Sequence, residues 1–151
     1  MRLHFLMLFL HLIGAVAWVG GMAFAYLCLR PALGVLPPPQ RLGLMRGVLG
    51  RFFAIVWVAL ACILVSGPVM LLEVGLRQAP RPWHLMAFLG LVMTGIFLSV
   101  WFGAWKRFAA AVDREDWAAG ARELNVIRQR VGLNLVLGLV TIAVATIGLG
   151  F

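Results

Sequence analysis

Four apolar stretches, each about as long as a lipid bilayer is thick, constrain the fold of this chain more than any other feature. A helix needs roughly 20 apolar residues to cross the ~30 Å hydrocarbon core of a membrane. The stretches do not alternate apolar and polar residues as the strands of a membrane barrel do. Since backbone groups in lipid must be hydrogen-bonded within their own segment, the sequence predicts four transmembrane helices. These cover Leu3–Leu29, Phe52–Leu72, Trp83–Trp105 and Val131–Phe151.

The composition supports a membrane bundle. Of the 151 residues, 64% are apolar and 12% are charged, against about 25% charged residues in soluble domains. A soluble chain of this length could not bury so much apolar surface, and its length suffices for one domain only. We therefore expect an all-α integral membrane protein in which residues 1–151 form a single four-helix bundle.

The basic residues predict the orientation of the bundle. Ten of the thirteen lie in two connections, residues 30–51 and 106–130, and only Arg2, Arg77 and Arg81 lie on the other side. Basic loops stay in the cytoplasm, so we expect both termini on the outer side of the membrane, which is the periplasmic side in a Gram-negative bacterium. The same bias accounts for the net charge of +8, so we expect no binding to nucleic acid.

The three connections differ in character. Residues 31–50 contain the triplet Pro37–Pro39, which predicts a stiff cytoplasmic loop because proline cannot continue a helix. Residues 73–82 form a short outer turn. Residues 106–130 are rich in alanine and in charges of both signs. This last pattern predicts that the third and fourth helices extend into the cytoplasm as a soluble hairpin.

One face of the first helix carries most of its polar and small residues. They recur at alternating spacings of three and four and therefore share one face of a helix. The remaining faces carry mainly Leu, Phe, Val and Ile, which suit lipid, so we expect this stripe to point into the bundle. It consists of His4, Met7, His11, Gly14, Trp18, Gly21, Ala25 and Cys28.

The other three segments carry similar faces. Small residues let helices approach closely, or leave room for a flat ligand between them, and both interpretations stay open for the glycines and hydroxyl residues. The faces hold Cys62, Ser66, Met70 and Glu73 in the second segment, His84, Thr94, Gly95 and Ser99 in the third, and Asn134, Gly138, Thr141, Ala145 and Gly148 in the fourth.

The three histidines are the strongest candidates for a binding site. His11 lies two turns deep in the first segment, roughly 10 Å below His4 at 1.5 Å per residue, and His84 opens the third segment on the same side. Ionisable groups within a span are costly and by default mark a functional site, and imidazole commonly ligates transition metals and haem iron. We predict a site in the outer half that includes His11, whereas His4 and His84 also suit solvated interface positions.

The segment Leu10–Gly21 contains a histidine, a tryptophan seven residues later and paired glycines. It resembles the first-helix signature of the copper resistance protein D family. Pro82–His84 and Asn134–Gly138 extend the resemblance over essentially the whole chain. The resemblance implies a multi-pass protein of copper passage or copper tolerance in the bacterial inner membrane, with His11 and Trp18 as site residues.

Copper chemistry suits further residues of the stripe. Imidazole binds copper, and the soft thioethers of Met7, Met70 or Met86 favour Cu(I). Besides lipid and the metal ion, a second copy of the chain and a periplasmic copper protein are candidate partners. The predicted copper ligands are His4, Met7, His11 and His84.

The same signature is similar to that of the bacterial membrane-bound protoporphyrinogen oxidases, four-helix proteins that bind b-type haem. This similarity implies an alternative function as a haem b redox protein, in which His11 and His84 ligate the iron from opposite sides. The lysine that these oxidases carry two residues after the third-helix histidine is replaced here by Met86. The remaining predicted cofactor-binding residues are Trp18, Gly14 and Gly21.

Sequence motifs for catalysis are absent. The chain has no nucleophile paired with a base, no phosphate-binding glycine loop and no pair of catalytic carboxylates. We therefore expect no enzymatic activity. A helical subunit that binds no metal is the third interpretation of the sequence.

Overall fold

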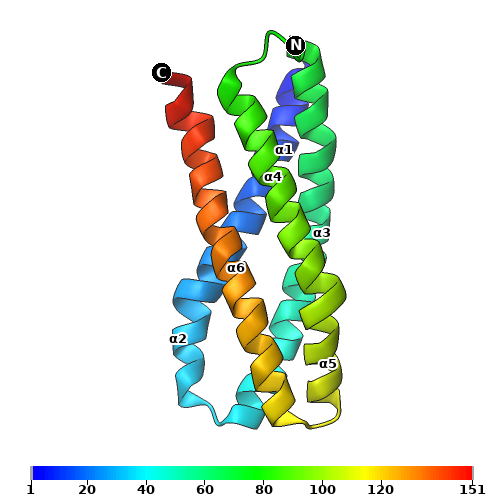
Figure 1. The fold of residues 1–151 in the computed structure, drawn as a ribbon, viewed down its shortest axis with the longest axis vertical. Coiled ribbons are helices and arrows are strands. Elements are labelled where there is room, and N and C mark those ends of the chain that lie inside the picture. The colour runs from blue at the N-terminus through cyan, green and yellow to red at the C-terminus, as the bar shows by residue number, and fades with distance from the viewer. Residues whose placement is uncertain (1, 151) are drawn as a thin grey trace.

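Four long helical rods make up the structure, a computed structural model that describes residues 2–150 and the side chains of residues 2–148. Each rod is long and apolar enough to cross a membrane, which confirms the predicted all-α fold with four spanning helices (Figure 1). Phe151, the last residue of the predicted fourth helix, lies outside the described residues. The rods comprise Arg2–Val35, Pro38–Val74, Arg81–Asp113 and Trp117–Thr146, the last followed by a 3-10 turn over Ile147–Gly150.

Two of the rods contain a π-helical turn. The first consists of α1 (Arg2–Phe24), a π turn, α2 (Arg30–Ala32) and a closing 3-10 turn, and the third consists of α4 (Arg81–Ser99), a π turn and α5 (Lys106–Asp113). The second and fourth rods are the single helices α3 (Pro38–Val74) and α6 (Trp117–Thr146). The two π turns cover Ala25–Leu29 and Val100–Trp105.

The first connection differs from its prediction. Only Leu36 and Pro37 separate the first two rods, and α3 begins at Pro38. Proline at the first helical positions costs no helical hydrogen bond, because the amides of the first turn have no partner within the helix. Its fixed φ angle also suits the helix. The triplet Pro37–Pro39 therefore starts a helix. The prediction of a long loop over residues 31–50, and of helices that end at 29 and begin at 52, was wrong for this reason.

The third connection is a tight turn between α5 and α6. Glu115, two residues after the end of α5, adopts a positive φ of 57°. The side chain of Asp116 accepts a hydrogen bond of 3.0 Å from the amide of Ala119 at the start of α6. Asp is a preferred residue at this capping position because it satisfies a free amide of the first turn. Residues 106–130 are thus almost entirely helical, and their location in the cytoplasm stays a prediction.

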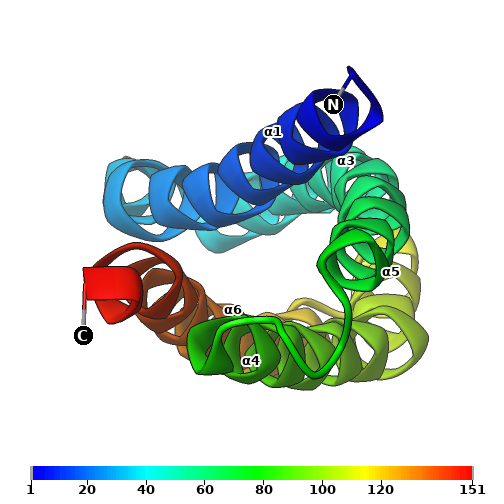
Figure 2. The ribbon, with the colours of Figure 1, turned by 90° about the horizontal axis from the view of Figure 1, so that it is seen from above.

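The rods associate in pairs. α1 packs along α3, and α4 packs along α6, as the view from above shows (Figure 2). Both termini lie at one end of the bundle, and the α2–α3 and α5–α6 turns lie at the other (Figure 1). We call residues 18–60 and 93–135 the hairpin half, and the remaining described residues the terminal half.

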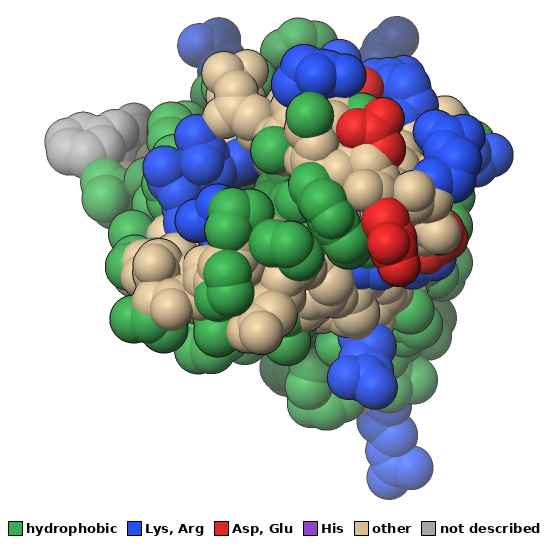
Figure 3. All heavy atoms as spheres, turned by 90° about the horizontal axis from the view of Figure 1, so that it is seen from below, with side chains coloured by type: hydrophobic (Ala, Val, Ile, Leu, Met, Phe, Trp, Pro, Cys, Tyr) green, Lys and Arg blue, Asp and Glu red, His purple; other side chains and the backbone are tan. Residues whose placement is uncertain are grey.

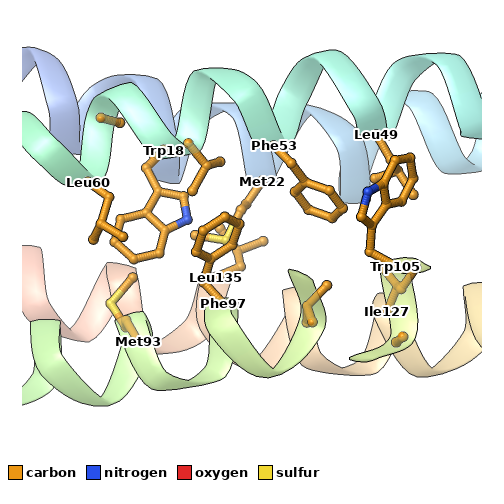
Figure 4. Packing of buried hydrophobic residues seen from close by; sticks show 14 of the residues in the cluster. Trp18, Met22, Leu49, Phe53, Leu60, Met93, Phe97, Trp105, Ile127 and Leu135 are labelled. Atoms are coloured by element: carbon orange, nitrogen blue, oxygen red, sulfur yellow. The ribbon is translucent and has the colours of Figure 1, made fainter. Parts of the chain in front are cut away.

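The buried apolar core lies in the hairpin half. Every buried member of the central hydrophobic cluster falls between Trp18 and Leu60 or between Met93 and Leu135. Aromatic rings run through it: Phe53 contacts Phe97 at 5.9 Å and Trp105 at 5.3 Å between ring centroids, both edge to face (Figure 4). Such edge-to-face contacts are favourable beyond their buried area. The hairpin half is therefore the tightly packed part of the bundle.

The outer surface of the rods is strongly apolar. Large side chains such as Phe5, Val16, Leu27 and Val136 are more than half exposed. In water such extensive apolar exposure would promote association, whereas lipid solvates it. The exposed surface thus agrees with the assignment of the four rods as membrane spans.

Candidate metal site between α1 and α3

Two polar contacts fix the register of α1 against α3. Nδ1 of His4 lies 3.0 Å from Oε2 of Glu73, and Nδ1 of His11 lies 3.0 Å from Oγ of Ser66. Seven residues forward along α1 correspond to seven residues backward along α3, so the two helices run antiparallel. The polar faces predicted for the first and second segments therefore meet each other.

The same register places two thioethers between these contacts. Met7 lies three residues after His4, and Met70 lies three residues before Glu73. Both methionines are buried, at 9% and 7% exposure. We call this set the α1–α3 ladder, and it consists of His4, Met7, His11, Ser66, Met70 and Glu73.

Hydrogen bonding defines the tautomer of His11. The Ser66 hydroxyl is fully buried and donates to the carbonyl oxygen of Cys62 at 2.5 Å. Its oxygen must then accept from His11, so Nδ1 carries the proton. Nε2 is left with a free lone pair. Metal-binding histidines in proteins are typically held in this way, through a hydrogen bond from the ring nitrogen that does not ligate.

His4 is arranged similarly at the end of the bundle. Its Nδ1 faces the Glu73 carboxylate, and both side chains are about one third exposed, at 36% and 33%. A carboxylate that accepts from one imidazole nitrogen increases the basicity of the other. Both histidines of the ladder thus have Nδ1 occupied and Nε2 available.

His84 has partners of a different kind, the backbone carbonyl groups of a turn. Its Nε2 lies 3.0 Å from the carbonyl oxygen of Leu76, and its Nδ1 lies 3.4 Å from that of Pro80. Both ring nitrogens therefore face the backbone of the turn that precedes α4. His11 and His84 have separate partners on separate elements, and no contact in the structure brings them together as axial ligands.

Three predicted cofactor residues of the first helix, Gly14, Trp18 and Gly21, lie in close contact with other helices. A Cβ atom added at Gly14 would lie 2.8 Å from the carbonyl oxygen of Ala59, and one at Gly21 would overlap the ring of Phe52. Trp18 is 3% exposed and packs against Phe97 with 6.2 Å between ring centroids. The two glycines let α1 approach α3 closely, as small residues do in membrane bundles.

The stripe on the first helix points inward except at its end. Its members from His4 to Ala25 are buried or half-buried, but Cys28 is exposed. A π turn contains one residue more than the α-helical turn it replaces, and the turn Ala25–Leu29 shifts the helical phase at this point. The prediction that Cys28 faces the interior was wrong because it assumed an unbroken α-helix.

Two partners in the ladder were absent from the predicted site. Ser66 and Glu73 were noted as members of a polar face but not as site residues. The signal that identifies them is the spacing of Cys62, Ser66, Met70 and Glu73, which are four, four and three residues apart and therefore share one face of a helix. Among residues 2–150 no three His, Cys, Asp or Glu side chains converge to hold a metal. The thioethers of Met7 and Met70 are the further soft donors on this interface.

Most of the chain matches a known protein family. The family model for copper resistance protein D matches residues 46–147, which is more than half of the chain. The chain belongs to the copper resistance protein D family. It matches no curated protein and no solved structure at significant similarity.

The extent of the match refines the predicted resemblance. Within this copper resistance protein D family member, the matched segment contains Ser66, Met70 and Glu73 but stops short of α1, which carries His4, Met7 and His11. The resemblance to the family is therefore shown for residues 46–147 and not for the whole chain. The similarity to protoporphyrinogen oxidases finds no support in these comparisons.

Proposed function

We propose that this member of the copper resistance protein D family binds Cu(I) along the α1–α3 ladder and passes it between positions on that ladder. The observation that supports the proposal is the arrangement of its two histidines. In each histidine, Nδ1 faces a partner on α3 and Nε2 has no partner in the described structure. Met7 and Met70, at intermediate positions of the same two helices, are buried. Imidazole and thioether together suit Cu(I).

The spacing of the ladder favours transfer over a single fixed site. His4 and His11 are about 10 Å apart along α1, too far to share one ion. Met7 lies about 4.5 Å along the axis from His4 and about 6 Å from His11. An ion could therefore exchange one imidazole for the other while it keeps a thioether ligand, and the Glu73 carboxylate would offset its positive charge at the exposed end.

A double substitution tests the thioether positions. We expect Met7→Leu combined with Met70→Leu to weaken Cu(I) binding at least about tenfold, because leucine preserves volume but removes the soft ligand. Competition with a chromogenic Cu(I) chelator measures this. Met86→Leu on α4 is the matched control and should bind as the native protein does. Equal affinity of the double variant and the control would disprove the proposed ligand set.

The visible absorption spectrum of the purified protein separates copper from haem. Cu(I) gives no band in this region, whereas haem gives an intense Soret band. We expect no Soret band in the native protein. A Soret band that is lost in His84→Ala and in His11→Ala would overturn the copper proposal in favour of the haem alternative.

We further propose that the ladder lies in the half of the bundle that faces the periplasm, with both termini outside. The support is the excess of basic residues at the opposite end, because basic loops remain in the cytoplasm. Gln40 and Gln78 are exposed at opposite ends, so Gln40→Cys and Gln78→Cys provide the test in a background with Cys28→Ser and Cys62→Ala. An impermeant thiol reagent added to intact cells should label only Gln78→Cys, and the reverse pattern would contradict this orientation.

A further inference from the structure

A cavity of about 370 Å³ opens at the hairpin end of the bundle, far from the ladder. Its walls come from the end of the first rod, the start of α3 and the start of α6. The floor is apolar and includes the buried side chains of Leu33, Leu42 and Ile127. The rim includes the exposed residues Gly34 and Asn125, so the cavity is accessible from the surface.

Three arginines line this cavity without a carboxylate partner. Among the described residues, the ion pairs are His4–Glu73, Arg46–Asp113 and Arg107–Glu123, and none of them includes a cavity arginine. The arginines that line it are Arg30, Arg41 and Arg128.

The neighbours of these arginines are uncharged. Arg30 lies over the ring of Tyr26 at 5.2 Å, and Arg128 donates to Oδ1 of Asn125 at 2.6 Å. No acidic side chain lines the cavity. Figure 3 shows the same imbalance across this end of the molecule, where basic side chains are spread round the surface and acidic ones gather on one side. The cavity is thus positively charged above an apolar floor.

The depth of the cavity matches the headgroup region of a membrane. The first rod has 34 residues and is about 50 Å long at 1.5 Å per residue, whereas the hydrocarbon core is about 30 Å thick. The cavity is lined by residues from Ala25 to Gly34, near the end of this rod. A rod of this length extends beyond the hydrocarbon core, and residues near its end reach the depth of the lipid phosphates.

We propose that this cavity binds the headgroup of an anionic phospholipid. Three guanidinium groups without counter-charges match a headgroup with net negative charge, and guanidinium forms strong charge-assisted hydrogen bonds with phosphate oxygens. A zwitterionic headgroup would bring its own cation into a site that already holds three. Basic pockets between helices on the cytoplasmic face are suited to anionic lipids in general.

Neutralisation of the cavity tests its charge. We expect the native protein to bind phosphatidylglycerol in preference to phosphatidylcholine, measured by native mass spectrometry of lipid-titrated protein. The triple variant Arg30→Gln, Arg41→Gln and Arg128→Gln should lose roughly a hundredfold in affinity for phosphatidylglycerol. The control removes the same charge from the same end outside the cavity, through Arg51→Gln, Arg114→Gln and Arg122→Gln. An equal loss in the control would show a general surface effect and overturn the proposal.

Filling the cavity tests its volume without changing charge. A Cβ atom at Gly34 meets nothing within 4 Å, so Gly34→Phe should occupy the cavity and weaken phosphatidylglycerol binding about tenfold. Gly47→Phe, at another open glycine outside the cavity, is the matched control and should leave binding unchanged. Inorganic phosphate should not displace the lipid at equal concentration. No preference for phosphatidylglycerol, displacement by phosphate, or full binding by Gly34→Phe would each contradict a lipid site.

Discussion

The hairpin half and the terminal half of this bundle are built from the same four rods but are stabilised differently. The hairpin half contains the whole buried cluster, with aromatic rings in contact from Trp18 to Phe108. The terminal half contributes no buried member to that cluster. Its best-defined contacts are polar pairs across the α1–α3 interface.

The difference shows how a small membrane protein can combine a tightly packed core with the polar side chains that we propose as copper ligands. In lipid, helices are held by close packing and by interhelical hydrogen bonds and not by the exclusion of water. The hairpin half is held by close packing, and its dense core fixes the positions of the rods. The terminal half can therefore contain polar and thioether side chains at its helix interface. The proposed path for Cu(I) needs side chains of these kinds. The comparison predicts that stability and copper binding respond to substitutions in different halves.

The largest effect on stability should come from the hairpin half. Phe53 is 1% exposed and contacts four aromatic rings, those of Phe52, Phe97, Trp101 and Trp105. Phe53→Ala should therefore cost about 3–5 kcal/mol through the cavity it leaves. Reversible unfolding in mixed micelles measures this. Copper affinity of the folded fraction should be unchanged. A loss of less than about 1 kcal/mol would contradict the assignment of the core to this half.

A smaller effect should follow from a glycine of the terminal half. Gly14→Ala places a methyl group 2.8 Å from the Ala59 carbonyl oxygen, which forces α1 and α3 apart and should cost about 1–3 kcal/mol. Because the same shift separates the two sides of the ladder, Cu(I) affinity should also fall. Gly20→Ala on the same helix, where a Cβ atom meets nothing within 4 Å, is the control. Equal melting temperatures for the two variants would argue against close contact at Gly14.

Removal of the serine hydroxyl should separate stability from metal binding. Ser66→Ala deletes the acceptor for Nδ1 of His11 and should cost only about 0.6 kcal/mol, the average for hydrogen bonds between membrane helices. Cu(I) affinity should fall by about tenfold or more, because the histidine loses its fixed orientation. Ser66→Thr retains the hydroxyl and should retain most of the affinity. Unchanged copper binding in Ser66→Ala would remove the support for His11 as an oriented ligand.

The smallest effect on stability should come from the exposed pair at the end of the ladder. Glu73→Gln removes the carboxylate beside His4, and partly exposed pairs of this kind contribute about 0–1 kcal/mol. We expect the rate of Cu(I) loading to fall even though the melting temperature stays within about a degree. Asp113→Asn disrupts the exposed pair with Arg46 at the other end and should change neither quantity. Equal loading rates in both variants would show that the carboxylate does not assist the ion.

The sequence predicted the four helices and most of the inward stripe because both depend on local patterns. Apolar length decides which segments enter lipid, and spacings of three and four decide which residues share a face. The ends of the helices were harder to predict. Pro38 and Pro39 at the start of α3 illustrate why, since proline either breaks or begins a helix according to its position.

The partners of the site residues could be predicted only in part. The polar faces of the first two segments are visible in the sequence, but the register that joins His11 to Ser66 depends on how two helices pack. The pairing of His84 with carbonyl oxygens of its own turn likewise depends on the fold of residues 75–81. The proposed haem pair of His11 and His84 rested on the similarity to the protoporphyrinogen oxidases and on the depth of both residues in the membrane, and depth says nothing of lateral position.

The π turns at Ala25–Leu29 and Val100–Trp105 allow the two halves to vary independently. A π turn arises when one residue is inserted into an α-helix, and each inserted residue rotates everything beyond it by about 100° around the helix axis. Both insertions occur in the hairpin half, in the first and third rods. Changes there can turn the wall that the first rod contributes to the cavity, and the end of the third rod, to new faces while His4, His11 and His84 keep their direction. Insertion and deletion at two such points would let evolution alter one end of the protein without altering the chemistry of the other.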